Sequence, residues 1–175
     1  MSSVKDAVLL AQGQIIDALV DCERQLADLY EKFAAAFPPH AAFWHRLAQE
    51  ERQHSQALDH LHALLARGHL FQNIGRFNEE NLAGTRAILA GAEQALTTRR
   101  LESDEAFALA LKLECTLLES RFYVSVSSDA SEYQAVSTIL HTETQQHIKR
   151  LHTEMGKGAG AAESYFDRTA PVPKH

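Results

Sequence analysis

Seven side chains of this chain have the types and spacings of metal ligands. They are Glu23, Glu50, Glu51, His54, Glu114, Glu143 and His147. Glu51 precedes His54 by three residues, and Glu143 precedes His147 by four. Residues at either spacing share one face of a helix. Carboxylates combined with imidazoles suit iron, manganese or zinc, and a glutamate can bridge two such ions. The chemistry indicated is therefore the binding of metal ions.

The apolar residues around these side chains predict that they face inward. Each residue turns a helix by about 100°, which places His54 between Leu47 and Leu61 on an apolar stripe. Glu114 falls in the same way among Phe107, Ala110 and Leu111, and His147 shares a face with Leu140 and Leu151. An unpaired carboxylate in a dry core costs several kcal/mol. Two divalent cations would cancel the charge of four carboxylates, so the pattern favours bound cations.

Four long helices are predicted to carry these residues, because apolar side chains recur at steps of three and four. They run from near Ser3 to Pro38, from His40 to Arg67, from Ser103 to Val126 and from Ser131 to Met155. The turn at Pro38-Pro39 is so short that the first two helices must form an antiparallel hairpin. Gly68 is expected to stop the second helix, and a shorter helix is expected within the connection 68–102.

The two helical hairpins resemble each other in sequence. A shift of 93 residues places Cys22 on Cys115, Tyr30 on Tyr123, Glu50 on Glu143 and His54 on His147. Two matching hairpins joined by a long crossover are the plan of a ferritin-like four-helix bundle. The predicted class is therefore all-α, with the bundle in residues 1–155 and a flexible tail in residues 156–175.

Longer motifs resemble the rubrerythrin-like branch of the ferritin-like superfamily. The first half has Glu23, Tyr30 and then Leu47-Ala48-Gln49-Glu50-Glu51-Arg52-Gln53-His54, and the second has Glu105-Ala106-Phe107-Ala108-Leu109-Ala110-Leu111-Lys112-Leu113-Glu114 and then Phe122-Tyr123. The resemblance spans residues 15–155. It implies a dimetal site whose direct ligands are Glu23, Glu51, His54, Glu114 and His147. Tyr30 is then either a hydrogen-bond donor to Glu23 or a core residue.

The resemblance implies two iron ions as cofactor, with manganese or zinc as alternatives. The implied function is that of a non-haem oxidoreductase acting on hydrogen peroxide or dioxygen, or of a ferroxidase that oxidises iron. Full-length rubrerythrins also carry a rubredoxin module with four cysteine ligands. This chain has only Cys22 and Cys115, which are expected to be buried free thiols. Turnover would therefore need an external electron donor.

One departure from the family pattern leaves a rival function open. A second Glu-x-x-His motif would need glutamate at position 144, where this chain has Thr144. Glu143 could serve as the metal ligand in its place if the helix adjusted locally, with Glu50 as its counterpart in the repeat. The metal site is otherwise expected to be mononuclear, asymmetric or lost. Without a metal ion, Glu114 would form a buried salt bridge with Arg121. The alternative is a degenerate bundle that acts as a metal-free binding or scaffold protein.

Composition narrows the partners. The formal charge of −6 argues against nucleic acid and anionic membranes, since both attract basic surfaces. No apolar run approaches the roughly 20 residues of a membrane span, so a cytoplasmic protein is expected. Bundles of the resembling family commonly pair. A homodimer is therefore also considered, with Phe71, Ile74 and Phe77 as apolar contacts.

Overall fold

The computed structural model describes residues 4–69, 71–72, 79–98, 101–119, 127–128 and 130–157. Its elements are α1 (Val4–Ala36), the 3-10 turn η1 (Pro38–His40), α2 (Ala41–Ala66), β1 (Phe71–Gln72), α3 (Glu79–Thr98), α4 (Ser103–Glu119), β2 (Ser127–Ser128) and α6 (Ser131–Lys157). Nearly all of the described chain is thus helical, which confirms the all-α class.

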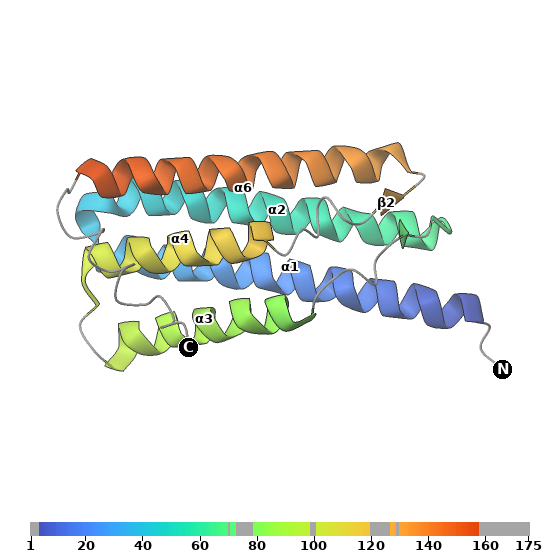
Figure 1. Cartoon of the computed structure of the whole chain (residues 1–175), viewed down its shortest axis with the longest axis horizontal. Coiled ribbons are helices and arrows are strands. Elements are labelled where there is room, and N and C mark those ends of the chain that lie inside the picture. The colour runs from blue at the N-terminus through green and yellow to red at the C-terminus, as the bar shows by residue number, and fades with distance from the viewer. Residues whose placement is uncertain are drawn as a thin grey trace, which may run out of the picture.

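The first two helices form the expected antiparallel hairpin (Figure 1). Helix α1 ends where the amide of Phe37 donates a hydrogen bond to the carbonyl of Phe33, at 2.8 Å. The next two residues, Pro38 and Pro39, then open the single turn η1. Proline has a fixed φ and no amide hydrogen, so it suits the first turn of a new helix but not the interior of an old one. The sequence therefore reverses the chain within the four residues 37–40.

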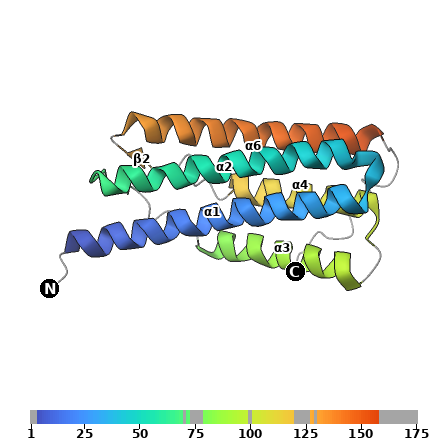
Figure 2. The ribbon, with the colours of Figure 1, turned by 180° about the vertical axis from the view of Figure 1, so that it is seen from behind.

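The second pair of long helices, α4 and α6, is also antiparallel. Helix α6 packs against both α4 and α2, and α3 packs against α1 and α4. Figures 1 and 2 show α1, α2, α4 and α6 with nearly parallel axes and α3 alongside α1. The crossover helix is longer than the short helix expected, at 20 residues.

A two-stranded pairing was not predicted from the sequence. Phe71 of β1 pairs with Ser128 of β2, and Gln72 pairs with Ser127. The pairing joins the chain just after α2 to the chain just before α6. Several predicted features lie outside the described residues: the helix beyond Glu119, the Glu114–Arg121 pair, Ile74 and Phe77 as dimer contacts, and the tail from residue 158 onward.

The buried apolar side chains form two separate clusters. In α2 the first cluster includes Trp44, Leu47 and Ala48, and the second includes Leu58 and Leu61. Between them, Glu51 and His54 are buried polar residues. Helix α6 repeats the arrangement in the opposite order. Leu140 of the second cluster comes before the buried His147, and Leu151 of the first cluster comes after it. A polar layer therefore crosses the core.

No helix within the described ranges is long and apolar enough to cross a lipid bilayer. The cytoplasmic location inferred from the sequence stays a prediction.

The end of α2 has a complete glycine cap, as the sequence predicts. Gly68 has a φ of +89°, a conformation that costs a residue with a Cβ about 1–2 kcal/mol. Its amide donates to the carbonyl of Leu65 at 2.9 Å, and the amide of His69 donates to that of Leu64 at 3.1 Å. These two bonds satisfy carbonyls that a helix end leaves without partners.

Gly68→Ala should therefore lower the free energy of unfolding by about 1 kcal/mol. Gly91 provides a matched control of opposite sign. It lies exposed in α3, and an added Cβ would meet nothing within 4 Å, so Gly91→Ala should raise stability by about 0.5–1 kcal/mol. Urea unfolding followed by far-ultraviolet circular dichroism measures both changes. Equal effects of the two substitutions would contradict the capping role.

Candidate metal centre

Five side chains with metal-binding atoms are almost fully buried at one level of the helices. They are Glu23 of α1, Glu51 and His54 of α2, Glu114 of α4 and His147 of α6, each exposing 2% of its surface or less. These are the five direct ligands that the family resemblance implies. Four helices contribute to the group, so only the folded chain can assemble it.

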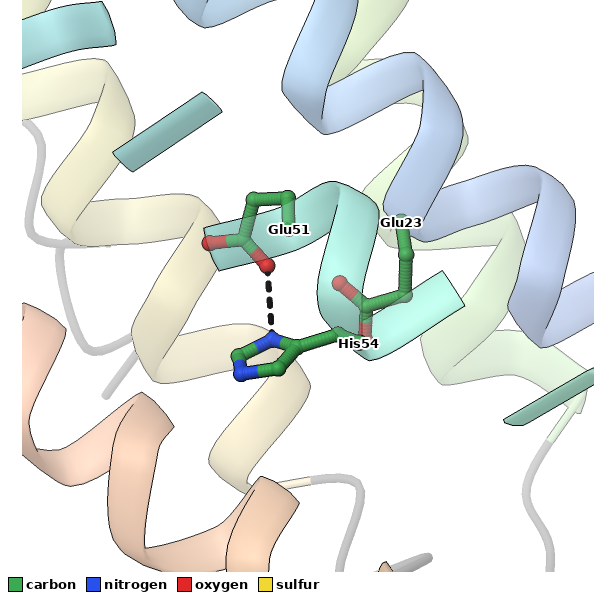
Figure 3. A group of neighbouring side chains, drawn as sticks. All are labelled: Glu23, Glu51 and His54. Atoms are coloured by element: carbon green, nitrogen blue, oxygen red, sulfur yellow. Dashed lines mark hydrogen bonds and ion pairs between the residues drawn. The ribbon is translucent and has the colours of Figure 1, made fainter. Parts of the chain in front are cut away.

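The five residues form two groups that share one member. Glu23, Glu51 and His54 make the first group, and Glu51, Glu114 and His147 make the second. Within each group one donor atom per residue lies within 4.8 Å of the others. Figure 3 shows the first group, with the carboxylates of Glu23 and Glu51 both directed toward His54 and a dashed line from Glu51 to the His54 ring. A shared carboxylate with two oxygens is the arrangement that can bridge two metal ions.

Glu51 uses its two oxygens toward two different helices. Its Oε2 lies 2.9 Å from Nδ1 of His54, and its Oε1 lies 2.8 Å from Nδ1 of His147. The second contact lacks hydrogen-bond geometry, because Glu51 Oε1 is buried without a hydrogen bond. The two imidazole rings are stacked, with centroids 5.3 Å apart and planes inclined by 18°. Both Nδ1 atoms thus approach one carboxylate.

The outer nitrogens of the histidines contact carboxylates of the opposite hairpin. Nε2 of His54 lies 2.7 Å from Glu143 of α6, and Nε2 of His147 lies 3.2 Å from Glu50 of α2. Glu50 and Glu143 are the residues that the 93-residue repeat superposes, so the two contacts are related by the same symmetry. The contact of His54 is a hydrogen bond, whereas that of His147 is an ion pair, because Nε2 of His147 has no hydrogen bond. A carboxylate hydrogen-bonded to the far nitrogen fixes the tautomer and orientation of a metal-binding imidazole.

Glu50 and Glu143 therefore lie on the side of each histidine ring that faces away from Glu51. Their side chains are 21% and 39% exposed, and neither belongs to the two buried groups. On α6 the inner position is occupied by Thr144, which is 3% exposed and whose hydroxyl donates to the carbonyl of Leu140 at 2.9 Å. The local adjustment that would bring Glu143 inward is therefore absent.

Tyr30 donates its hydroxyl hydrogen to Oε1 of Glu114 at 2.7 Å. From the sequence, Tyr30 is either a donor to Glu23 or a core residue; the acceptor is in fact Glu114 and not Glu23. Tyr30 is fully buried, and its ring packs 5.6 Å from that of Trp44. Burial, and then the negative charge of Glu114, raise the pKa of Tyr30 well above its usual value. The hydroxyl therefore stays a neutral donor that holds one oxygen of Glu114 in place.

Electrostatics of the protein without metal make both imidazoles cationic. Burial alone would lower the pKa of His54, but the hydrogen bond and charge of Glu51 raise it to about 9. Burial opposes protonation of His147 as well, yet Glu51 and Glu114 raise its pKa to about 12. In return, His147 holds the pKa of Glu51 far below its usual value despite complete burial. Metal ions would have to displace these protons.

Two features of the site had no counterpart in the sequence analysis. One is the crossed pairing of histidines with Glu50 and Glu143. The other is a guanidinium clamp, in which Arg150 donates to both oxygens of Glu50 and Arg46 donates to one of them at 3.2 Å. Arg46 and Glu50 stand four residues apart, a spacing that signals an exposed helical ion pair. Burial raises the pKa of Glu50, but the hydrogen bonds and positive charges of His147 and Arg150 lower it to about 2.

The cysteines take no part in the polar layer. Cys22 is fully buried, and burial followed by the charge of Glu23 raises the pKa of its thiol. Such a thiol is a poor nucleophile and ligand, because the thiolate is the reactive form. Cys115 is half-buried, and both cysteines are free. The prediction of free thiols is therefore confirmed, although only Cys22 is fully enclosed.

Comparison of the chain with known protein families, with curated proteins and with solved structures gives no match. Evidence for a function therefore comes from the geometry of the chain itself. The strongest part of that geometry is the pair of buried groups that share Glu51.

The histidine pKa values predict how the metal-free protein responds to pH. Above pH 6.5 the unfolded chain releases the protons of His54 and His147, while the folded protein keeps that of His54 up to about pH 9. The folded state then binds more protons, so its stability falls as pH rises through this window. We expect a loss of about 1 kcal/mol per pH unit or more.

Urea unfolding of chelator-treated protein at several pH values measures this slope. His54→Gln should flatten it, because one of the two protons is then missing from both states. His60 is an exposed histidine on the same helix, and His60→Gln should leave the slope unchanged. A stability that stays level between pH 6.5 and 9 would contradict the cationic state of the buried imidazoles.

Proposed function

We propose that this chain is a non-haem dimetal carboxylate protein with a ferritin-like four-helix bundle, and that its two ions are iron. The observation that carries the proposal is the sharing of Glu51 between two buried groups of donors. Glu23, Glu51 and His54 would hold one ion, and Glu51, Glu114 and His147 the other. Both histidines would bind through Nδ1, the nitrogen that lies beside Glu51.

The arrangement of the helices supports the ferritin-like assignment. Hairpins α1/α2 and α4/α6 pack together and are joined by a crossover that contains α3. Di-iron proteins of this class take a glutamate from each of two helices, and a Glu-x-x-His pair from the other two. Here α1 and α4 each give one glutamate, and α2 gives the complete pair. Helix α6 gives only the histidine. The rubrerythrin-like motifs of the sequence agree with this plan.

Charge gives a physical reason for metal ions at this site. Three carboxylates within a few ångströms, each 1–2% exposed, repel one another in a medium of low dielectric. The buried Oε1 of Glu51 has no hydrogen bond and only an ion pair with His147, so a metal ion could replace the proton of that imidazole and bind this oxygen. Carboxylate and imidazole donors suit iron, manganese and zinc, and iron adds the redox chemistry that the rubrerythrin-like motifs imply.

Two reduced iron ions can together supply two electrons to a small oxidant such as hydrogen peroxide or dioxygen. The protein's own residues prepare the site for that role. Glu143 orients His54 through a hydrogen bond at Nε2, Glu50 forms an ion pair with Nε2 of His147, and Tyr30 holds Glu114 through a hydrogen bond. The two apolar clusters on either side of the layer keep bulk water away. Electrons for further turnover would come from an external donor. Peroxidase and ferroxidase activities both fit this site.

A second candidate function remains, that of a metal-free binding or scaffold protein. It is favoured by the raised pKa values of His54 and His147, which let two imidazolium ions neutralise buried carboxylates without any metal. The two candidates differ in one measurable quantity, the number of metal ions that each folded chain retains.

Metal analysis after purification under iron-replete conditions tests the proposal. The wild-type chain should retain two ions, Glu114→Ala about one, and Glu51→Ala none, because Glu51 alone belongs to both groups. Glu31→Ala is the matched control, since Glu31 pairs with Arg52 and His45 at the surface and should not affect retention. A wild-type chain that retains no metal would contradict the dimetal proposal and favour the metal-free alternative.

Substitution of Glu50 or Glu143 should lower the affinity for metal ions but leave the number of ions per chain unchanged. Glu143→Gln keeps the shape of the side chain but removes the charge that faces His54 Nε2. We expect two ions per chain with affinity reduced by roughly 10–100-fold, measured by competition with a chelator. Loss of one ion would instead make Glu143 a direct ligand.

Activity separates the two oxidants. Anaerobic protein loaded with ferrous iron should oxidise its iron on mixing with hydrogen peroxide or with dioxygen, and stopped-flow absorbance gives both rates. Faster reaction with peroxide would indicate a peroxidase, and faster reaction with dioxygen a ferroxidase. Gln53→Ala, at an exposed position of α2, should keep the wild-type rates. Glu51→Ala should react no faster than free iron. If Glu51→Ala instead reacted as fast as the wild type, the reaction would have to occur at another site.

A further inference from the structure

The two carboxylates at the outer nitrogens of the histidines have different surroundings, although the 93-residue repeat superposes them. Glu50, which forms an ion pair with His147, also accepts hydrogen bonds from two guanidinium groups. Arg150 donates to both of its oxygens, and Arg46 donates to one of them. The single negative charge of Glu50 therefore faces two arginines in addition to the imidazole.

Glu143 lacks the counterparts of both arginines. A shift of 93 residues places Ile139 at the position of Arg46 and Ala57 at that of Arg150. Neither side chain carries a charge, and Ile139 is 49% exposed. In the described part of the chain, no arginine or lysine forms an ion pair with Glu143, which contacts only a buried imidazole. The repeat is thus broken in charge as well as in sequence.

Each of these carboxylates adjoins one of the two buried groups of donors. The His147 position consists of Glu51, Glu114 and His147, and the His54 position consists of Glu23, Glu51 and His54. The charge of Glu143 adds to the attraction of a divalent ion to the His54 position, whereas the arginines on Glu50 offset that attraction at the other. Both carboxylates are partly exposed, at 21% for Glu50 and 39% for Glu143. Solvent therefore reduces the difference but does not remove it.

We infer that the two positions bind metal with unequal affinity, and that the arginines on Glu50 make the His147 position the weaker one. This inference rests on the proposed dimetal function and adds an order of occupation to it. The first ion fills the His54 position. The ion at the His147 position is the first to leave when a chelator is added, so one ion exchanges with the solution while the other is retained.

Single-site variants measure the two affinities separately. Glu114→Ala keeps all ligands of the His54 position only, and Glu23→Ala keeps those of the His147 position only. Cobalt(II) is the probe, because it binds the same kinds of donor as iron and its visible absorption reports binding. In competition with a chelator, Glu114→Ala should bind cobalt about tenfold more tightly than Glu23→Ala. Equal affinities, or the reverse order, would overturn the inference.

Further substitutions test whether the arginines cause the difference. Added to Glu23→Ala, Arg150→Gln removes the bidentate contact with Glu50 and should tighten cobalt binding several-fold. Arg46→Gln should act in the same direction. It changes a side chain that is 67% exposed, so it tests the same cause if Arg150→Gln does not fold. Cobalt affinity that stays the same in the folded variants would overturn the role of the arginines.

The repeat also supplies a substitution of opposite sign. Added to Glu114→Ala, Ile139→Arg places an arginine four residues before Glu143, as Arg46 stands before Glu50, and should weaken cobalt binding at the His54 position. No change in affinity would contradict the inference.

Arg52→Gln, added to Glu23→Ala, is the matched control, since Arg52 is an exposed arginine of α2 that pairs with Glu31. It should leave cobalt affinity unchanged, and a gain equal to that of Arg150→Gln would reduce the effect to net charge and overturn the inference. A wild-type chain that binds no cobalt would overturn the dimetal function as well. Two bound ions in the wild type, with equal affinities in the single-site variants, would overturn this inference alone.

Discussion

The structure depends on how the charge of the buried Glu51 carboxylate is balanced. An isolated carboxylate at 1% exposure would be neutralised by protonation, yet the pKa of Glu51 is held far below its usual value. Two imidazoles from different helices achieve this, one on each oxygen. In the metal-free protein they act as imidazolium ions, and bound metal ions would replace their protons. Either way, cations must lie between α2 and α6, which fixes the relative height of these helices.

The same requirement shapes the core around the layer. Apolar side chains cannot satisfy the carboxylates, so the core is divided into one cluster that contains Trp44 and Phe107 and another that contains Leu58 and Leu140. Each cluster is large enough to bind the helices together on its own side. The ring of Tyr30 packs against that of Trp44, and its hydroxyl donates to Glu114. The apolar clusters thus position the side chains of the polar layer, and contacts within that layer fix how the helices are aligned along their axes.

Local signals allowed much of this to be predicted from the sequence. The apolar steps of three and four, the Pro38-Pro39 turn and the Gly68 cap act within one or two helical turns, and the observed ends of α1 and α2 agree with them. Burial of Glu51, His54 and His147 follows from the same periodicity. Contacts between elements were not accessible in this way. The β1–β2 pairing, the acceptor of Tyr30 and the crossed histidine contacts depend on the rotation and height of one helix relative to another.

The crossed contacts have a consequence for the half-chains. The outer nitrogen of His54 is oriented from α6, and that of His147 from α2. A hairpin expressed alone would keep its own glutamate and histidine but would lose the group that orients the ring. It could recover an equivalent contact only from a second copy of itself, bound about a two-fold axis. The two hairpins of the present chain are therefore comparable to the subunits of such a dimer, but the covalent connection between them allows their sequences to differ, as at Glu51 and Thr144.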